Sequence, residues 1–334
     1  KARGLALIRR AQRVELVQLM RAIDDPAFVE VQKRMRNTEL DRPVCPEFLE
    51  SLSAVSGDDV EADPEWRFAP IGVISRLDRD VINATQADAF AREFETPLIT
   101  WPLPTADLPI DDETLKHDLY AAEPGLWGYF VEGAPVNLTE NVRPVRKLVN
   151  GSPALLDSLV FDERVDPEAR RCTHFDSKGV PCQWEMCRLS EVYQLGGYQR
   201  VELFHPPLAI NVRVGGKTSP AGKKPGSVKG SVLWHGVELD DLSSLIQSVT
   251  PDAQVIPLFA SRNIKEGVRL RSLVAAENGL PATLKVFEHQ YCLAFALTDF
   301  KLQGRTLPKL SLAILPRKTA PYRALGGFYV FVSR

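Results

Sequence analysis

The last 44 residues, Tyr291 to Arg334, constrain the fold most strongly. An apolar, strand-like run from Cys292 to Leu297 leads into a polar segment, and a second apolar run spans Leu310 to Leu315. The sequence FYVFVSR follows and carries the terminal arginine. The predicted order is therefore strand, polar loop or short helix, strand, arginine.

A strand followed by a helix is also predicted near the middle of the chain. The apolar run Phe68–Ile74 is typical of a buried strand, and Arg79–Phe94 has the apolar spacing of a helix that packs on a sheet. This order predicts an α/β layer. Pro97–Trp101 is a further candidate strand, and helices are predicted over Pro26–Asn37 and Pro46–Val55.

From Gly133 onward the pattern changes to short apolar runs separated by Gly, Pro and Asn. Several short strands with turn signals predict a small β-barrel or sandwich. Thr218–Lys229 is expected to be a flexible basic loop. The predicted strands are Pro135–Leu138, Leu155–Phe161, Val201–Phe204, Leu208–Val214, Ser231–Leu239 and Val255–Phe259.

Composition and charge exclude several classes of protein. The 334 residues are 44% hydrophobic with a formal net charge of -2, which fits about two globular domains. No apolar stretch is long enough for a membrane span, and five cysteines fit reduced thiols, so an intracellular protein is expected. Residues 1–36 and 285–334 are basic, and Asp41–Glu123 is acidic. The basic ends form either a phosphate-binding face or an unevenly charged solvated surface.

The segment ALTDFKLQGRTL, residues 296–307, resembles the fifth motif of superfamily-1 DNA helicases, in the branch of the petite-integration-frequency (PIF-one) and RecD-like enzymes. The common sequence pattern of this motif is A-x-T-x-H-K-x-Q-G-x-T-L, in which Phe300 stands where His is frequent. The resemblance implies DNA contacts for three residues and a place near the nucleotide for two. The DNA-contacting residues are Thr298, Lys301 and Thr306, and those near the nucleotide are Gln303 and Gly304.

Two further stretches resemble motifs of the same family. FYVFVSR is similar to the sixth motif, Y-V-A-x-S-R, which implies that Arg334 is an arginine finger. LVQLMRAIDDPAFVEVQKRMR is similar to the fourth motif, which implies that Arg21 faces the γ-phosphate and that Asp25 and Phe28 are structural. An arginine acts there by stabilising charge on the transferring phosphoryl group. Taken alone, Arg21 is equally well explained as a helix-surface residue. The alternative for Arg334 is an exposed chain-terminal arginine, which the ordered pair of motifs disfavours.

The segment GAPVNLTENVRPVRKLVNG, residues 133–151, is similar to the stretch that leads into the family's small inserted SH3-like barrel. Asn141 and Asn150 are predicted to form turns rather than to bind ligands, because Asn-Gly suits a tight turn. Trp127, Tyr129, Trp184 and Tyr198 are able to stack on bases. Aromatic residues in a β-rich segment are nevertheless more often part of the core, and that interpretation is favoured here.

A phosphate loop requires G-x-x-x-x-G-K-[ST] between a strand and a helix. The nearest imitation, Gly215-Gly216-Lys217-Thr218, has Asn211 at the first glycine position and cannot start a helix. No acidic Mg²⁺-binding motif appears either. A zinc cluster is a second alternative, and a loop without metal is favoured over it because paired C-x2-C spacing is absent. Its candidate ligands are Cys172, His174, Cys182 and Cys187.

The predicted fold class is α/β: a RecA-like (P-loop NTPase type) second motor domain, residues 1–130 plus 286–334, with a β-rich SH3-like insertion at 131–285. The resemblance implies the C-terminal part of an ATP-dependent 5′–3′ DNA helicase, acting in unwinding, repair, recombination or transposition. Its expected partners are single-stranded DNA and an upstream RecA-like domain that binds most of the ATP and Mg²⁺, in nucleus or mitochondrion. This chain alone is expected not to hydrolyse ATP. The alternative is a non-catalytic nucleic-acid-binding remnant of a mobile-element helicase.

Overall fold

The computed structural model describes slightly more than half of the chain, in two compact units. One unit comprises residues 1–54, 303–306 and 318–334, and the other comprises 55–302 and 307–317. No helix in the described parts is long and apolar enough to cross a membrane. The described residues are 26–36, 54–106, 108–146, 148–160, 190–195, 198–203, 205–214, 233–234, 255–260, 267–302, 307 and 309–313.

The first unit contributes the helix α2, Pro26–Arg36, and thereby confirms the helix predicted from Pro26. Val31 on this helix is buried. The helix predicted over residues 46–55 lies almost entirely outside the described residues.

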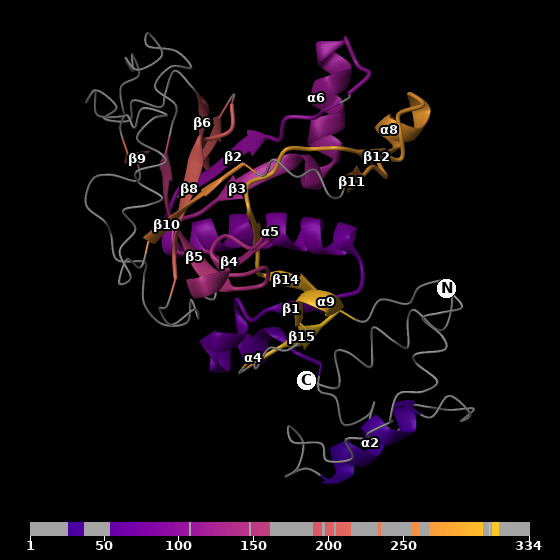
Figure 1. Cartoon of the computed structure of the whole chain (residues 1–334), viewed down its shortest axis with the longest axis vertical. Helices are drawn as coiled ribbons and strands as arrows, with labels where there is room; N and C mark the ends of the chain where they lie inside the picture. The colour runs from indigo at the N-terminus through magenta and orange to yellow at the C-terminus, as the bar shows by residue number, and fades with distance from the viewer. Residues whose placement is uncertain are drawn as a thin grey trace. The chain divides into compact units, whose positions relative to one another are not determined.

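The second unit contains a parallel sheet covered by a long helix (Figure 1). Its strands are β1 (Ile71–Val73), β14 (Ala296–Thr298) and β15 (Ser311–Leu312), in the order β14-β1-β15. The short helix α4 (Gly57–Ala62) precedes β1. The sheet confirms the predicted α/β layer. Each of its three strands lies within one of the apolar runs predicted as strands.

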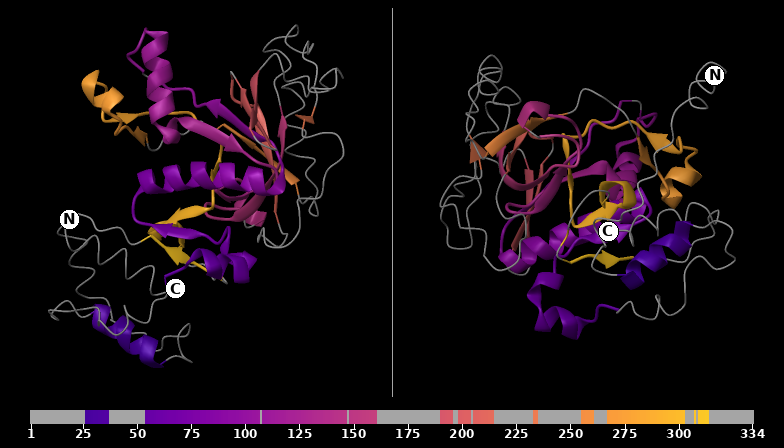
Figure 2. Two further views of the ribbon diagram at one scale, coloured as in Figure 1. Left: turned by 180° about the vertical axis from the view of Figure 1, so that it is seen from behind. Right: turned by 60° about the horizontal axis from the view of Figure 1, so that its bottom comes forward.

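The helix α5, Arg76–Phe94, lies between this sheet and a second, four-stranded sheet (Figures 1 and 2). It begins three residues before the predicted start because the Ser75 side chain caps it, accepting a hydrogen bond of 3.1 Å from the Asp78 N–H. Phe90 packs against Phe68 and Phe295, with ring centroids 5.0 and 5.5 Å away. These aromatic contacts hold α5 on the parallel sheet.

The apolar run 292–297 was predicted as one strand, and that prediction is wrong. The run is divided between β13 (Tyr291–Leu293) and β14, which belong to different sheets. Buried Asn83 on α5 holds the bend: its Oδ1 accepts the Ala296 N–H at 2.8 Å, and its Nδ2 donates to the Leu293 carbonyl at 3.1 Å. The other backbone groups of the bend pair with backbone: the Ala294 N–H donates to the Pro135 carbonyl, and the Phe295 carbonyl accepts the Ile71 N–H.

A third sheet, of six strands, has the order β10-β8-β5-β4-β13 among the described residues, with β9 paired to β5. Neighbouring strands along this order are antiparallel. The β-rich segment is confirmed, whereas the SH3-like barrel stays a prediction. The strands are β4 (Pro135–Leu138), β5 (Pro153–Val160), β8 (Ala209–Arg213), β9 (Leu233–Trp234) and β10 (Val255–Phe259).

The four-stranded sheet has the order β3-β2-β7-β6 and joins segments from both sides of residue 130. Its strands β2 and β3 pair with each other, and β2 pairs in parallel with β7. In addition, β13 pairs with β4, although the predicted domain boundary between residues 285 and 286 assigns these two strands to different domains. The domain boundaries drawn from sequence stay a prediction. The strands are β2 (Leu98–Pro102), β3 (Trp127–Phe130), β6 (Ser190–Leu195) and β7 (Tyr198–Leu203).

Several small elements were not predicted. Besides α4, β3 and β6, they are the helices α6 (Glu113–Ala122) and α8 (Leu273–Glu277), and the paired strands β11 (Val268–Arg269) and β12 (Thr283–Leu284). Buried Glu123, directly after α6, accepts the backbone N–H groups of Arg271 and Ser272, each at 2.6 Å. A buried carboxylate is acceptable here because two donors compensate for its lost hydration.

Candidate functional site

The candidate site lies where two neighbouring parallel strands end. Val73 at the end of β1 is in register with Thr298 at the end of β14. The carboxyl ends of parallel strands are where α/β sheets usually bind their ligands. Thr298, which the motif resemblance assigns to DNA, therefore stands at the edge of the sheet that suits a ligand.

The short helix α9, Asp299–Leu302, follows β14 directly and carries Lys301. The Lys301 Nζ donates a hydrogen bond to the Asn150 Oδ1. This contact joins the fifth-motif segment to the segment around Asn150-Gly151, which is 151 residues away in sequence. The structure thus brings together two motifs that the sequence analysis treated separately.

Asn150 lies in a turn, as predicted. The Asn141 Oδ1 accepts the Asn150 N–H at 2.9 Å, and the Gly151 N–H donates to the Leu138 carbonyl at 2.7 Å. Gly151 has a φ of 91°, a conformation that glycine adopts without strain. Asn141 acts as a turn former, and Asn150 adds the contact with Lys301.

Most of the other predicted site residues lie outside the described residues, and their roles stay predictions. They are Arg21, Gln303, Gly304, Thr306 and Arg334, together with the side chain of Phe300. The zinc candidates at 172, 174, 182 and 187 also lie outside. Within the part of the chain that the structure describes, no group of three His, Cys, Asp or Glu side chains is arranged to hold a metal ion.

Two of the aromatic residues considered for base stacking, Tyr198 and Trp127, make packing contacts and hydrogen bonds within the protein. Tyr198 is buried, donates its hydroxyl hydrogen to Asp88, and lies under the guanidinium of Arg92 at 5.6 Å. The Trp127 Nε1 donates to the Tyr120 carbonyl at 2.7 Å. These contacts favour the core interpretation for both residues. Trp184 lies outside the described residues.

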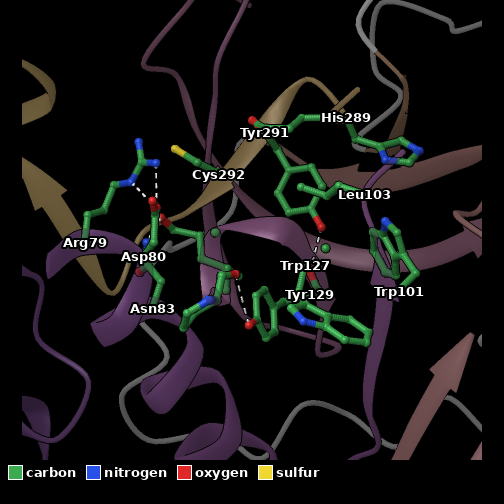
Figure 3. A pocket seen from close by; sticks show the side chains of 15 residues that line it. Arg79, Asp80, Asn83, Trp101, Leu103, Trp127, Tyr129, His289, Tyr291 and Cys292 are labelled. Carbon is green, nitrogen blue, oxygen red and sulfur yellow. Dashed lines mark hydrogen bonds and ion pairs between the residues drawn. The ribbon is translucent and has the colours of Figure 1, made fainter. Parts of the chain in front are cut away.

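A pocket that the sequence analysis missed lies between α5, β2, β3 and the segment around β13 (Figure 3). Arg79 and Asp80 form an ion pair of 2.6 Å on its α5 side. The Tyr291 hydroxyl donates to the Tyr129 carbonyl at 2.6 Å, and the Tyr129 hydroxyl donates to the Pro124 carbonyl at 3.3 Å. The sequence gives no local signal for this pocket, because its residues come from segments more than 200 positions apart.

Burial controls protonation in the pocket. It raises the pKa of the Tyr129 and Tyr291 hydroxyls, so both stay protonated. It also raises the pKa of Asp80, an effect that the charge of Arg79 opposes. The Cys292 thiol likewise has a raised pKa because it is buried. A thiol with a raised pKa is a poor nucleophile, so this cysteine is not a catalytic candidate.

No protein-family model matches the chain, and no curated protein matches it. Solved structures do match. The crystal structure of Pif1 helicase from Candida albicans is 15% identical, with a TM-score of 0.45 over 98% of this chain and 56% of its own. The crystal structure of Pif1 helicase from Bacteroides in complex with ADP-AlF3 and ssDNA is also 15% identical. Its TM-score is 0.41, and the match covers 96% of this chain and 49% of its own.

A structure of two coordinating Pif1 helicases on forked double-stranded DNA matches with 14% identity and a TM-score of 0.42, over 93% of this chain and 45% of its own. The chain spans about half the length of the solved structures it matches. The solved structures named here, to which the chain is similar, are Pif1 helicases.

Proposed function

We propose that this chain is the C-terminal part of an ATP-dependent DNA helicase of the PIF-one/RecD-like type. Its parallel sheet and α5 would belong to a RecA-like second motor domain, and its β-rich segment to an SH3-like insertion. The proposed activity is movement along single-stranded DNA in the 5′–3′ direction, in repair, recombination or transposition. The nucleus or the mitochondrion is the proposed location.

The observation that carries the proposal is the position of Thr298 and Lys301. Thr298 ends β14 beside the end of β1, and Lys301 lies on the first turn after it. A hydroxyl group and an ammonium group at the carboxyl edge of a parallel sheet suit the phosphate backbone of a nucleic acid, because phosphate contacts are sequence-independent. A motor that moves along DNA requires contacts of this kind.

ATP and Mg²⁺ are proposed to bind mainly to an upstream RecA-like domain. Arg21 and Arg334 would then approach the γ-phosphate from this chain. Phosphoryl transfer depends on positioning and on charge stabilisation, and an arginine finger contributes about 10³–10⁵-fold to its rate. By itself the chain is expected to bind single-stranded DNA and to show no ATP hydrolysis.

The test uses the whole natural protein with ATP and Mg²⁺ on two duplexes, one with a 5′ tail and one with a 3′ tail. Unwinding of the 5′-tailed duplex is expected, and Arg334→Ala should lower ATP hydrolysis by about 10³-fold or more while nucleotide binding persists. Unwinding of the 3′-tailed duplex alone would contradict the proposed direction. DNA binding without ATP-driven unwinding would instead favour the non-catalytic remnant.

A further inference from the structure

The hydrogen bond between Asn150 and Lys301 joins the fifth-motif segment to the β-rich segment. Lys301 lies on α9, whereas Asn150 lies in the turn between β4 and β5. Asn150 is exposed and Lys301 is half-buried. Their contact is therefore made at the protein surface and is not a consequence of core packing.

Strand pairing places this turn beside the segment that carries Lys301. The strand β4, which leads into the turn, pairs with β13, and β13 precedes β14 and α9 along the chain. Directly after β4, the Thr139 N–H donates to the Gln290 carbonyl at 3.0 Å. The Gln290 Nε2 donates to the Glu140 carboxylate at 3.1 Å. The start of the turn is thus fixed to the chain that leads into α9.

Further hydrogen bonds hold the backbone on either side of Asn150. Arg143 and Leu148 exchange two backbone hydrogen bonds, of 2.9 and 3.1 Å. The Ser152 Oγ accepts the Val149 N–H at 3.0 Å, and the Ser152 N–H donates to the Val149 carbonyl at 2.9 Å. None of these contacts uses the Asn150 side chain, so removal of its amide should leave the turn in place.

An amide oxygen is a suitable support for a lysine that binds phosphate. A lysine carries its ammonium group on a flexible four-carbon stem, and fixing such a side chain on binding costs about two- to tenfold in affinity. A support that holds the ammonium before the phosphate arrives removes part of this cost. Because the amide is uncharged, it leaves the positive charge of Lys301 intact, whereas a carboxylate at the same place would cancel it.

We propose that Asn150 positions the Lys301 ammonium for a phosphate of single-stranded DNA, so that the β-rich segment supports DNA binding through this turn. The proposal rests on the function proposed above, which assigns Lys301 to the DNA backbone. Asn150 is a positioning residue, because it acts through Lys301. Its effect on affinity should be the same for every DNA sequence, since a phosphate contact carries no base information.

The test is a double-mutant cycle on Asn150 and Lys301, measured as the affinity of the purified chain for labelled oligo-dT. Asn150→Ala should weaken binding by about two- to fivefold in the wild-type chain. It should have no effect in the Lys301→Ala background, because no ammonium is left to position. Asn150→Asp should make the slope of log affinity against log salt shallower by about 0.7, because its carboxylate cancels one positive charge. Asn150→Ala should leave this slope unchanged.

Asn278→Ala is the matched control, since the exposed Asn278 side chain donates only to the Val274 carbonyl of its own helix, and it should leave DNA binding unchanged. Urea unfolding checks that the Asn150 variants keep the fold, and Asp-Gly suits a tight turn as Asn-Gly does. Wild-type affinity in Asn150→Ala, or equal weakening with and without Lys301, would overturn the proposal while the role of Lys301 stands. A Lys301→Ala chain that binds DNA like the wild type would instead overturn the proposed function, and this inference with it.

Discussion

At the scale of single residues, Asn83 determines how the chain reaches the candidate site. Its side chain bonds the Ala296 N–H and the Leu293 carbonyl, and so separates β13 from β14. Without it, the buried Ala296 N–H would have no side-chain partner at the bend. The position of Thr298 at the end of β14 therefore depends on a side chain in α5.

Asn83→Ala is expected to lower the free energy of unfolding by about 2–3 kcal/mol, because it leaves buried backbone groups unpaired. Urea unfolding measures this loss. Asn278→Ala is the matched control: the Asn278 side chain is exposed and donates only to the Val274 carbonyl of its own helix. The control should cost less than about 0.5 kcal/mol. Equal losses in the two variants would contradict the role given to Asn83.

His289 should make stability depend on pH. Its pKa is lowered from 6.5 to about 4 by burial, so between these values the unfolded chain binds the proton more tightly than the folded chain does. The contribution of the neutral ring is complete above about pH 6.5 and is lost as the pH falls towards 4. Between pH 7.5 and 4.5 it amounts to about 2–3 kcal/mol.

The measurement compares urea unfolding of the wild type and His289→Phe at these two pH values. The variant should lose less stability on acidification than the wild type does. His117→Phe is the control, since the His117 side chain is 82% exposed, and it should follow the wild type. A wild type and His289→Phe with the same dependence on pH would show that His289 is not the group responsible.

At the scale of elements, local patterns predicted those helices and strands that depend on local interactions. The 3.6-residue apolar spacing identified α5, and the short apolar run 135–138 identified β4. The break between β13 and β14 could not be predicted, because it depends on Asn83, which is 213 residues from Ala296 in sequence. The place of α8 likewise depends on Glu123, 149 residues before Ser272. Such contacts leave no local pattern.

The end of α5 offers a way to raise stability. Glu95 follows the helix with a φ of 52°, which lies in the left-handed region. That conformation destabilises any residue with a Cβ by about 1–2 kcal/mol. Glu95→Gly should therefore raise the free energy of unfolding by up to about 1 kcal/mol, measured by urea unfolding. Gln86→Gly, inside the same helix, should lower it by about 1 kcal/mol. Destabilisation by both variants would contradict this account of the helix end.

At the scale of the whole molecule, the candidate site combines what sequence predicts with what it does not. The spacing of Thr298 and Lys301 after a strand placed them at a sheet edge, since this relation is local. The contact of Lys301 with Asn150 and the pocket around Trp101 depend on how distant segments fold together. Motif spacing therefore predicted which residues contact a DNA backbone, and only the three-dimensional structure could reveal the pocket.

Lys301→Ala is expected to weaken binding of single-stranded DNA by about three- to tenfold, equally for oligo-dT and oligo-dA, because a phosphate contact carries no base information. The slope of log affinity against log salt should become shallower by about 0.7–1, as one fewer counterion is released. Fluorescence anisotropy of labelled oligonucleotides at several salt concentrations measures both quantities. Lys116→Ala is the control, since Lys116 lies on α6 and pairs with Glu113 at 3.5 Å. An unchanged salt slope for Lys301→Ala would remove this residue from the DNA surface, and with it the main support for a motor domain in this chain.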